Sequence, residues 1–211
     1  MFNLIKVVTR STKGSLNLRQ YLHSSGLLIS TVTLIMSNSL IAVKSKLVQA
    51  QTIPVTASWR QASFPLENFQ AYTSGYGYRV HPISGYTKFH QGLDLAAPLG
   101  SYVRSWWSGQ VVALSDHTGC GTMITIQSGK WTHIYCHLMG SVENTPKGTV
   151  LVDRSGGIVL WLGQNVPAGA RIARVGMTGR TTGPHLHWEL KYNGNHLDPA
   201  DVLRQMFAER T

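Results

Sequence analysis

Acidic residues are scarce in this sequence, and they are missing altogether from its first fifty positions. The chain has nine Asp and Glu against nineteen Lys and Arg, which gives a formal net charge of +10. Six of the basic residues lie within 1–50, so the remainder carries thirteen basic and nine acidic residues. Those thirteen are scattered and form no run of the kind that follows a phosphate backbone. The composition therefore argues against a nucleic-acid-binding protein.

Residues 1–50 also lack the uniformly apolar stretch of a resident membrane helix. Four basic residues precede LLISTVTLIMSNSLIAV at 27–43, a segment barely long enough to cross a bilayer and interrupted by six Ser, Thr and Asn residues. Val48 and Ala50 then occupy the positions that a signal peptidase reads. We interpret 1–50 as a signal peptide cleaved after Ala50, with an uncleaved N-terminal membrane anchor as the alternative. Either interpretation places the rest of the chain outside the cytoplasm, in the periplasm, in the cell wall or secreted.

Helical segments are nearly absent from the rest of the chain, which at this length has room for one ordinary domain. Residues 51–71 have two prolines and no clear period, which predicts a linker or lead-in before a domain at 72–211. That domain consists of short β-prone runs separated by turn signals, a pattern typical of all-β proteins. Only the end of the chain has helical composition, with Asp198 as a cap and Pro199 in the first turn. We expect antiparallel β-sheets and one short C-terminal helix.

Two segments of the predicted domain echo each other. APLGSYVRSWWSG at 97–109 and VPAGARIARVGMTG at 166–179 share Pro-x-Gly-x-x-[Val/Ile] followed by a further glycine. The echo predicts two strands entered by the same kind of turn, as the halves of a duplicated motif. Chance is the alternative, because Pro-Gly turns are common before strands.

The chain has only two cysteines, and each lies beside a β-prone run. Cys120 opens CGTMITIQ and Cys136 lies in WTHIYCHL, with Ser128 and Gly129 as a predicted hairpin turn between the runs. A turn centred there would pair Cys120 with Cys136 across the ladder. In an exported protein this predicts a disulfide worth about 3 kcal/mol, with two buried free thiols as the alternative.

The run HLHWEL at 185–190 places two histidines on one face of a predicted strand. Side chains alternate along a strand, so His185, His187 and Glu189 should point one way and the apolar residues between them the other. One imidazole can then bind a metal while the next reaches a water bound to it. Structural histidines on the surface are the alternative.

Two further segments carry residues of the same chemistry. FHQGLDLAAPLG places His90 and Asp94 four positions apart, and THIYCHL should project His133, Tyr135 and His137 from one strand face. Imidazole and carboxylate ligands suit Zn²⁺, and three protein ligands leave a fourth position for water. The sequence lacks H-E-x-x-H, which excludes the usual helical arrangement of zinc proteases.

Taken together, TSGYGYRVHPISGYTKFHQGLDLAAPLGSYVRSWWSGQVV, YCHL and VGMTGRTTGPHLHWEL resemble the lysostaphin-type, or LytM-type, zinc metallopeptidases. The resemblance covers about residues 72–198. It implies an antiparallel β-domain with a groove, a duplicated motif, one zinc ion per chain and hydrolysis of peptidoglycan peptides, with zinc-bound water as the nucleophile. It also implies His90, Asp94 and His187 as zinc ligands, and His137 and His185 as the catalytic histidines that bind no metal.

Three more residues are candidates for substrate binding. Arg79 lies in YRVHPISG, a segment that the family shares, and a purely structural turn is the alternative there. His133 and Tyr135 should share a strand face with His137 and could line the groove, although solvent exposure of His133 is the alternative. Membrane contact is expected only through 1–50, if that segment stays uncleaved.

The sequence departs from the family's pattern at 141–163, SVENTPKGTVLVDRSGGIVLWLG, which we interpret as an inserted hairpin with its tip at 153–157. We expect it to form one wall of the groove and to influence the choice of substrate. One alternative function is a non-catalytic cell-wall-binding or amidase-activating domain of the same fold. Another is a sugar-transport phosphocarrier, against which the export signal argues.

Overall fold

The structure is a computed structural model that describes residues 59–80 and 84–210. The predicted signal segment, 1–50, lies outside the described residues, as does the first part of the predicted linker. In the part of the chain that is described, no helix is long and apolar enough to span a membrane.

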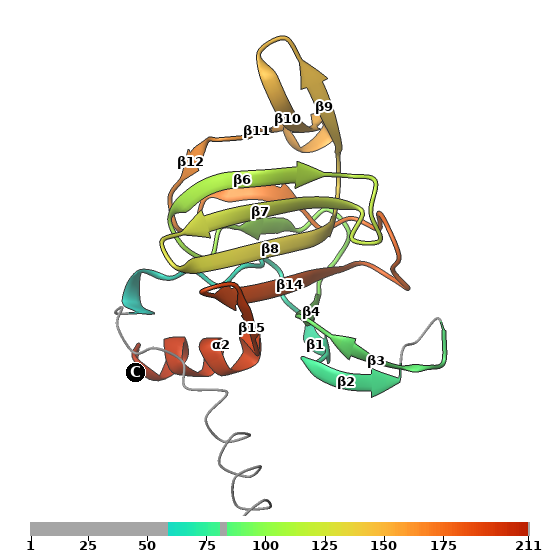
Figure 1. Cartoon of the computed structure of the whole chain (residues 1–211), viewed down its shortest axis with the longest axis vertical. Helices are drawn as coiled ribbons and strands as arrows, with labels where there is room; N and C mark the ends of the chain where they lie inside the picture. The colour runs from blue at the N-terminus through green and yellow to red at the C-terminus, as the bar shows by residue number, and fades with distance from the viewer. Residues whose placement is uncertain (1–58, 81–83, 211) are drawn as a thin grey trace, which may run out of the picture. The chain divides into compact units, whose positions relative to one another are not determined.

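One antiparallel sheet dominates the domain (Figure 1). Its strands follow the spatial order β1-β4-β14-β8-β7-β6-β12, and β15 pairs with β14. In that order they are β1 (Ala71–Ser74), β4 (Leu93–Ala96), β14 (His185–Tyr192), β8 (Trp131–Leu138), β7 (Thr122–Ser128), β6 (Gly109–Ser115), β12 (Asn165–Val166) and β15 (Asn195–Leu197). The two central strands, β14 and β8, are the longest, and both carry histidines.

Smaller elements surround this sheet. Two two-stranded sheets are formed by β2 (Gly77–Val80) with β3 (Thr87–His90), and by β5 (Tyr102–Arg104) with β13 (Arg171–Arg174). A 3-10 turn, η1 (Trp59–Gln61), opens the described chain, and α2 (Pro199–Ala208) closes it, with the Asp198 side chain accepting a hydrogen bond from the backbone N–H of Ala200. The prediction of an all-β domain with one C-terminal helix is confirmed.

The segment expected to be a linker contributes to the core instead. Trp59, Ala62 and Leu66 are all buried, and Leu66 forms a β-bridge with Val103. The ring of Trp59 packs edge-on against its neighbours in a group of tryptophans. The folded unit therefore begins well before residue 72, because burying this lead-in removes large apolar side chains from water.

The two echoed segments pair with each other, as strands β5 and β13. Their turns contain Gly100 and Gly169, with φ of 84° and 79°, a left-handed conformation that favours glycine. The backbone hydrogen bonds around the two turns are reciprocal: Gly100 N to Val175 O and Val175 N to Ser101 O on one side, Gly169 N to Ser105 O and Ser105 N to Ala170 O on the other. The repeat is thus visible as a local twofold arrangement.

The inserted segment is a three-stranded sheet and not a single hairpin. It consists of β9 (Ser141–Thr145), β10 (Gly148–Asp153) and β11 (Ile158–Trp161), in the order β11-β10-β9. The turn expected at its tip, η2 (Arg154–Gly156), joins β10 to β11, and a second turn joins β9 to β10. Figure 1 shows β9 and β10 at the top of the view, at the opposite end from β2 and β3.

Candidate metal centre and catalytic cleft

A cleft of about 710 Å³ opens on the face of the sheet formed by β4 and β14. The β2–β3 hairpin contributes residues to it, and so do the loop around Gly119 and the loop at 180–182. No residue of 141–163 lines the cleft, so the expectation that the inserted segment forms one of its walls is wrong. The β9–β11 sheet occupies another part of the domain.

Strand β14 follows the predicted alternation. Leu186, Trp188 and Leu190 are fully buried, whereas His185 and His187 are partly exposed and line the cleft. The sequence places the two imidazoles on one face because the strand repeat is two residues.

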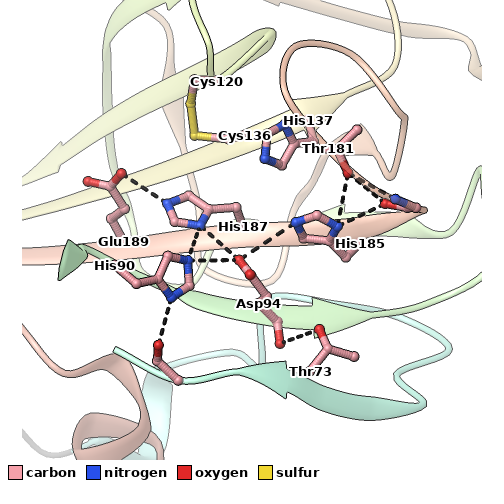
Figure 2. Close-up of polar contacts among 12 residues, drawn as sticks. Thr73, His90, Asp94, Cys120, Cys136, His137, Thr181, His185, His187 and Glu189 are labelled. Atoms are coloured by element: carbon pink, nitrogen blue, oxygen red, sulfur yellow. Dashed lines mark hydrogen bonds and ion pairs between the residues drawn. A yellow bond between two sulfur atoms is a disulfide. The ribbon is translucent and has the colours of Figure 1, made fainter. Parts of the chain in front are cut away.

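The three residues that the resemblance implies as ligands lie together (Figure 2). Asp94 on β4 is the register partner of His187 on β14, and His90 ends β3. Nδ1 of His187 lies 2.8 Å from Oδ1 of Asp94 and 2.9 Å from Nε2 of His90, which is itself 3.1 Å from the same carboxylate oxygen. Two imidazole nitrogens and one carboxylate oxygen converge on a point, which is a donor set that suits Zn²⁺.

Outer partners orient both of these imidazoles. Nδ1 of His90 donates to the carbonyl of Gly75 at 2.7 Å, and Nε2 of His187 donates to Glu189 at 3.0 Å. The opposite nitrogen of each ring therefore faces Asp94, as the second shell of a metal site requires. Sequence reasoning placed Glu189 on this face but gave it no role, although its position two residues after His187 already carried the signal.

Charge-assisted hydrogen bonds link Asp94 with His90 and His187. Burial disfavours the charged form of Asp94, but hydrogen bonds from His187 and His90 outweigh it and hold the pKa of the carboxyl well below its usual range. Burial would lower the pKa of His187, yet its hydrogen bonds to Asp94 and Glu189 raise that pKa to about 9. A metal ion binding here has to replace the proton on Nδ1 of His187.

His137 and His185 face each other beside this cluster, with ring centroids 4.9 Å apart. Nδ1 of His137 donates to the carbonyl of Thr178 at 2.9 Å, and Nδ1 of His185 donates to that of Gly183 at 2.8 Å. Nε2 of His185 lies 3.6 Å from Oδ1 of Asp94. Burial lowers the pKa of His137 to about 4, so its ring is neutral near pH 7. Because Nδ1 of each ring is used by a backbone carbonyl, Nε2 is the nitrogen of each that is available for proton transfer.

The expectation that His133 and Tyr135 line the groove is wrong, because both side chains are fully buried. The Tyr135 hydroxyl lies 2.7 Å from Nδ1 of His133 and accepts a hydrogen bond from the backbone N–H of Trp106 at 2.8 Å. Burial lowers the pKa of His133 to about 3. These two residues form a neutral polar network inside the core.

The backbone of His137 explains why it does not follow its neighbours. On β8, Cys136 is the register partner of His187 and Tyr135 is that of Trp188, so Cys136 lies on the same sheet face as His187 and Tyr135 faces the core. Strict alternation would turn His137 toward the core as well. Its φ of 60° reverses the side chain and points it at His185 instead.

Cys120 and Cys136 are joined as a disulfide, with their Cα atoms 5.1 Å apart, but the predicted register is wrong. Ser128 pairs with Trp131 across the β7–β8 hairpin, so the turn lies at Gly129 and the next residue. Cys120 lies in the loop before β7, outside the β7–β8 ladder. The loop, and not a pairing within the ladder, brings Cys120 next to Cys136.

Arg79, a predicted substrate-binding residue, lies at the cleft. It lines the cleft from β2, and its Nη2 is 3.5 Å from Oδ2 of Asp94. Arg180, which sequence reasoning did not single out, lines the cleft on the side of Gly119. It gives no periodic signal in the sequence, because it lies in a loop.

Comparisons with known proteins place this architecture. The chain is 34% identical over 131 residues to DD-carboxypeptidase/endopeptidase Mpg of Neisseria meningitidis serogroup B, which covers 62% of this chain and 26% of that protein. It is 34% identical over 145 residues to peptidoglycan DD-endopeptidase ShyA of Vibrio cholerae serotype O1, covering 68% and 27%. The match thus spans about a quarter of the length of these relatives.

Solved structures agree with these sequence relatives. A zinc-containing peptidase from Vibrio cholerae has a TM-score of 0.51 at 32% identity, covering 64% of this chain and 37% of that one. The catalytic domain of the prophage-encoded M23 protein EnpA from Enterococcus faecalis has a TM-score of 0.50 at 29% identity, covering 67% and 95%. Residues 88–199, slightly more than half of the sequence, match the model of peptidase family M23. The chain belongs to peptidase family M23.

Proposed function

We propose that this chain is an exported zinc metalloendopeptidase that hydrolyses peptide bonds in peptidoglycan stem peptides or cross-bridges. One observation carries the proposal. Two histidines and one aspartate converge within ligand distance in an open cleft, with two further histidines beside them. The relatives include a peptidoglycan DD-endopeptidase, which supports this choice of substrate.

His90, Asp94 and His187 would hold the metal, and their geometry fits it. Each histidine has its outer nitrogen committed to an acceptor, so the inner nitrogen is free for a ligand bond once His187 loses its proton. When bound, the zinc ion supplies a Lewis acid for the scissile carbonyl and lowers the pKa of a coordinated water toward roughly 7.

His185 and His137 would handle the protons of the reaction. Each ring has its Nδ1 on a backbone carbonyl, which leaves Nε2 as the nitrogen that can exchange a proton with a substrate or water. One ring accepts the proton of the attacking water and one returns a proton to the leaving amine, as general base and general acid. A domain that only binds cell wall has no use for two oriented bases beside a ligand cluster, so their presence supports catalysis.

The extracytoplasmic location is part of the proposal. The signal-like composition of 1–50 supports export, and so does the Cys120–Cys136 disulfide, since disulfides persist in oxidising compartments. Peptidoglycan, the proposed substrate, lies outside the cytoplasmic membrane.

The proposal is tested by digesting purified peptidoglycan of several cross-link types with the purified full chain. The fragments are analysed by mass spectrometry, with and without a chelator. Release of peptides with new amino and carboxyl ends, abolished by the chelator, is the expected result. Intact cross-links with every substrate, in the presence of zinc, would contradict it.

A further inference from the structure

His137 has a backbone conformation that is uncommon for residues other than glycine. Its φ of 60° lies in the left-handed region, which costs a residue with a Cβ about 1–2 kcal/mol. This conformation turns the side chain out of the core and into the cleft. The contacts around His137 must therefore supply the energy that keeps it there.

Those contacts come from one loop on each side. The backbone N–H of His137 donates to the carbonyl of Cys120 at 2.8 Å, and its carbonyl accepts from Gly176 at 2.9 Å. Its Nδ1 donates to the carbonyl of Thr178. Cys136, the residue before His137, is covalently bonded to Cys120. The disulfide thus ties the loop that receives the His137 N–H to the strand that carries His137.

The loop that carries Cys120 also contacts the loop around Thr178, whose carbonyl accepts the hydrogen bond from the His137 imidazole. The N–H of Arg180 donates to Gly119 at 2.8 Å, and the N–H of Thr122 donates to the Thr178 hydroxyl at 2.9 Å. The packing is tight, because a Cβ added at Gly121 would overlap the backbone of Thr178. Displacing Cys120 would therefore loosen both the backbone and the side-chain partner of His137.

We propose that the Cys120–Cys136 disulfide is a positioning element for His137. This proposal rests on the proposed function, in which His137 accepts or donates a proton. Cys136 is the register partner of His187, but the ligand residues His90, Asp94 and His187 are carried by β3, β4 and β14, and none of them lies on the Cys120 loop that the disulfide ties down. Loss of the disulfide should therefore impair proton transfer and leave the affinity for zinc unchanged.

The test is a double variant of the full chain, Cys120→Ser with Cys136→Ser, loaded with zinc and assayed well below its Tm. We expect unchanged zinc affinity and a kcat lower by about tenfold to a hundredfold, since small misplacements of catalytic groups cost that much. Gly121→Ala, which keeps both cysteines but displaces the loop, should give the same pattern. Leu160→Ala is the control. It creates a cavity beside the inserted sheet, so it should lower Tm without lowering kcat.

A second readout does not depend on activity. The Nδ1 proton of His137, hydrogen-bonded to Thr178, should give an imidazole N–H signal in the nuclear magnetic resonance spectrum of the parent chain and lose it in the double variant. A folded double variant that keeps this signal and the parent kcat would overturn the proposal. An inactive parent chain whose signal still depends on the disulfide would instead contradict only the proposed function.

The charge of the cleft carries a second, independent inference. The cleft is lined by three cationic side chains, Arg79, Lys88 and Arg180, and by two carboxylates, Asp94 and Glu189. Both carboxylates are hydrogen-bonded to His187. Within residues 59–80 and 84–210, no ion pair is formed by Lys88 or Arg180. The charges left available to a ligand are therefore positive.

We infer that Arg180 binds a free carboxylate of the substrate peptide. Its backbone is fixed by the hydrogen bond to Gly119, while its exposed guanidinium lies over that glycine, so the fork is accessible to a ligand. Arg180 also precedes Thr181, whose hydroxyl lies 3.3 Å from Nδ1 of His185. A carboxylate on Arg180 would thus hold the peptide next to the proton-handling histidines, with the two-pronged geometry that arginine favours. This inference also rests on the proposed function.

The test measures the Kd of two peptidoglycan fragments for the zinc-loaded His185→Ala chain, which should bind without turnover and serves here as the parent. One fragment has free carboxylates and the other has those groups amidated. We expect the parent chain to prefer the free acid and Arg180→Gln to lose about tenfold in affinity for it alone, as loss of a charged hydrogen bond implies. Arg154→Gln, in an exposed ion pair on the inserted segment, should change neither Kd. A parent chain that does not prefer the free acid, or an Arg180→Gln variant that weakens both fragments equally, would overturn the inference. Since Kd is measured without turnover, it separates this inference from the proposed activity.

Discussion

Asp94 and His187 are register partners in the β4–β14 ladder, and their side chains meet with Oδ1 2.8 Å from Nδ1. The pairing of two adjacent antiparallel strands thus brings together residues 93 positions apart in the sequence. Directly opposite residues in a ladder have neighbouring Cβ atoms, so a shift of one residue would separate the pair. The candidate metal centre therefore depends on the sheet register itself.

Replacing His187 by alanine should remove both the metal and the activity. The variant loses the nitrogen at the centre of the cluster and leaves Glu189 without its hydrogen-bond donor. Zinc content by elemental analysis and turnover of peptidoglycan are the measurements. A variant that kept its zinc would show that His187 is not a ligand.

Replacing His185 by alanine should separate binding from catalysis. Its Nε2 lies 3.6 Å from Oδ1 of Asp94, farther than the ring nitrogens of His90 at 3.1 Å and His187 at 2.8 Å, so we expect it to act as a base and not as a ligand. We expect unchanged zinc content and a loss of turnover of about a hundredfold or more. If this variant lost its zinc while His187→Ala kept it, the roles of the two histidines would be exchanged.

Glu189 should tune the affinity for the metal through His187. Glu189→Ala removes the acceptor of the His187 Nε2 proton and should weaken zinc binding by about tenfold to a hundredfold. Glu189→Gln keeps an oxygen acceptor and should lose less. Competition with a chromogenic chelator measures both. Equal losses in the two variants would mean that the carboxylate acts by its charge alone.

The ion pair between Asp153 and Arg174 should make stability depend on pH. Two hydrogen bonds, of 2.7 and 2.9 Å, hold the pKa of the Asp153 carboxyl below its usual value. Its stabilisation is therefore present above the unfolded pKa of about 3.9 and is lost as pH falls through the lower folded pKa.

Asp153→Asn should accordingly lower the free energy of unfolding at pH 7 by about 1–3 kcal/mol, and Tm with it. The difference in stability between variant and parent should shrink below about pH 4. Thermal unfolding across this pH range measures it. Glu143→Gln is the matched control, because its partner Arg154 is largely exposed and such pairs contribute little. A difference that did not change with pH would assign the effect to packing.

The part of the site that follows strand periodicity could be predicted from sequence. The faces of β14 follow from a two-residue repeat, and the helix cap at Asp198 follows from its neighbouring proline. The convergence of three distant segments was implied by the resemblance, since no spacing in the sequence encodes which strands become neighbours.

The errors arise where the backbone departs from ideal geometry. A positive φ at His137 breaks the alternation that put His133 and Tyr135 in the groove, and the β7–β8 turn lies one residue later than predicted, with Ser128 paired to Trp131. His137 itself is neither glycine nor proline, so the sequence does not mark the positive φ there. Trp59 was assigned to a linker because a single buried aromatic residue has no period to detect.

Metal removal and restoration test the central claim most directly. The purified full chain should carry about one zinc ion, lose its turnover of peptidoglycan when the ion is removed, and regain it with one equivalent of zinc. Circular dichroism should show the same fold throughout. A metal-free chain that keeps its fold and its full activity would contradict the assignment of His90, Asp94 and His187 as the zinc site of a metallopeptidase.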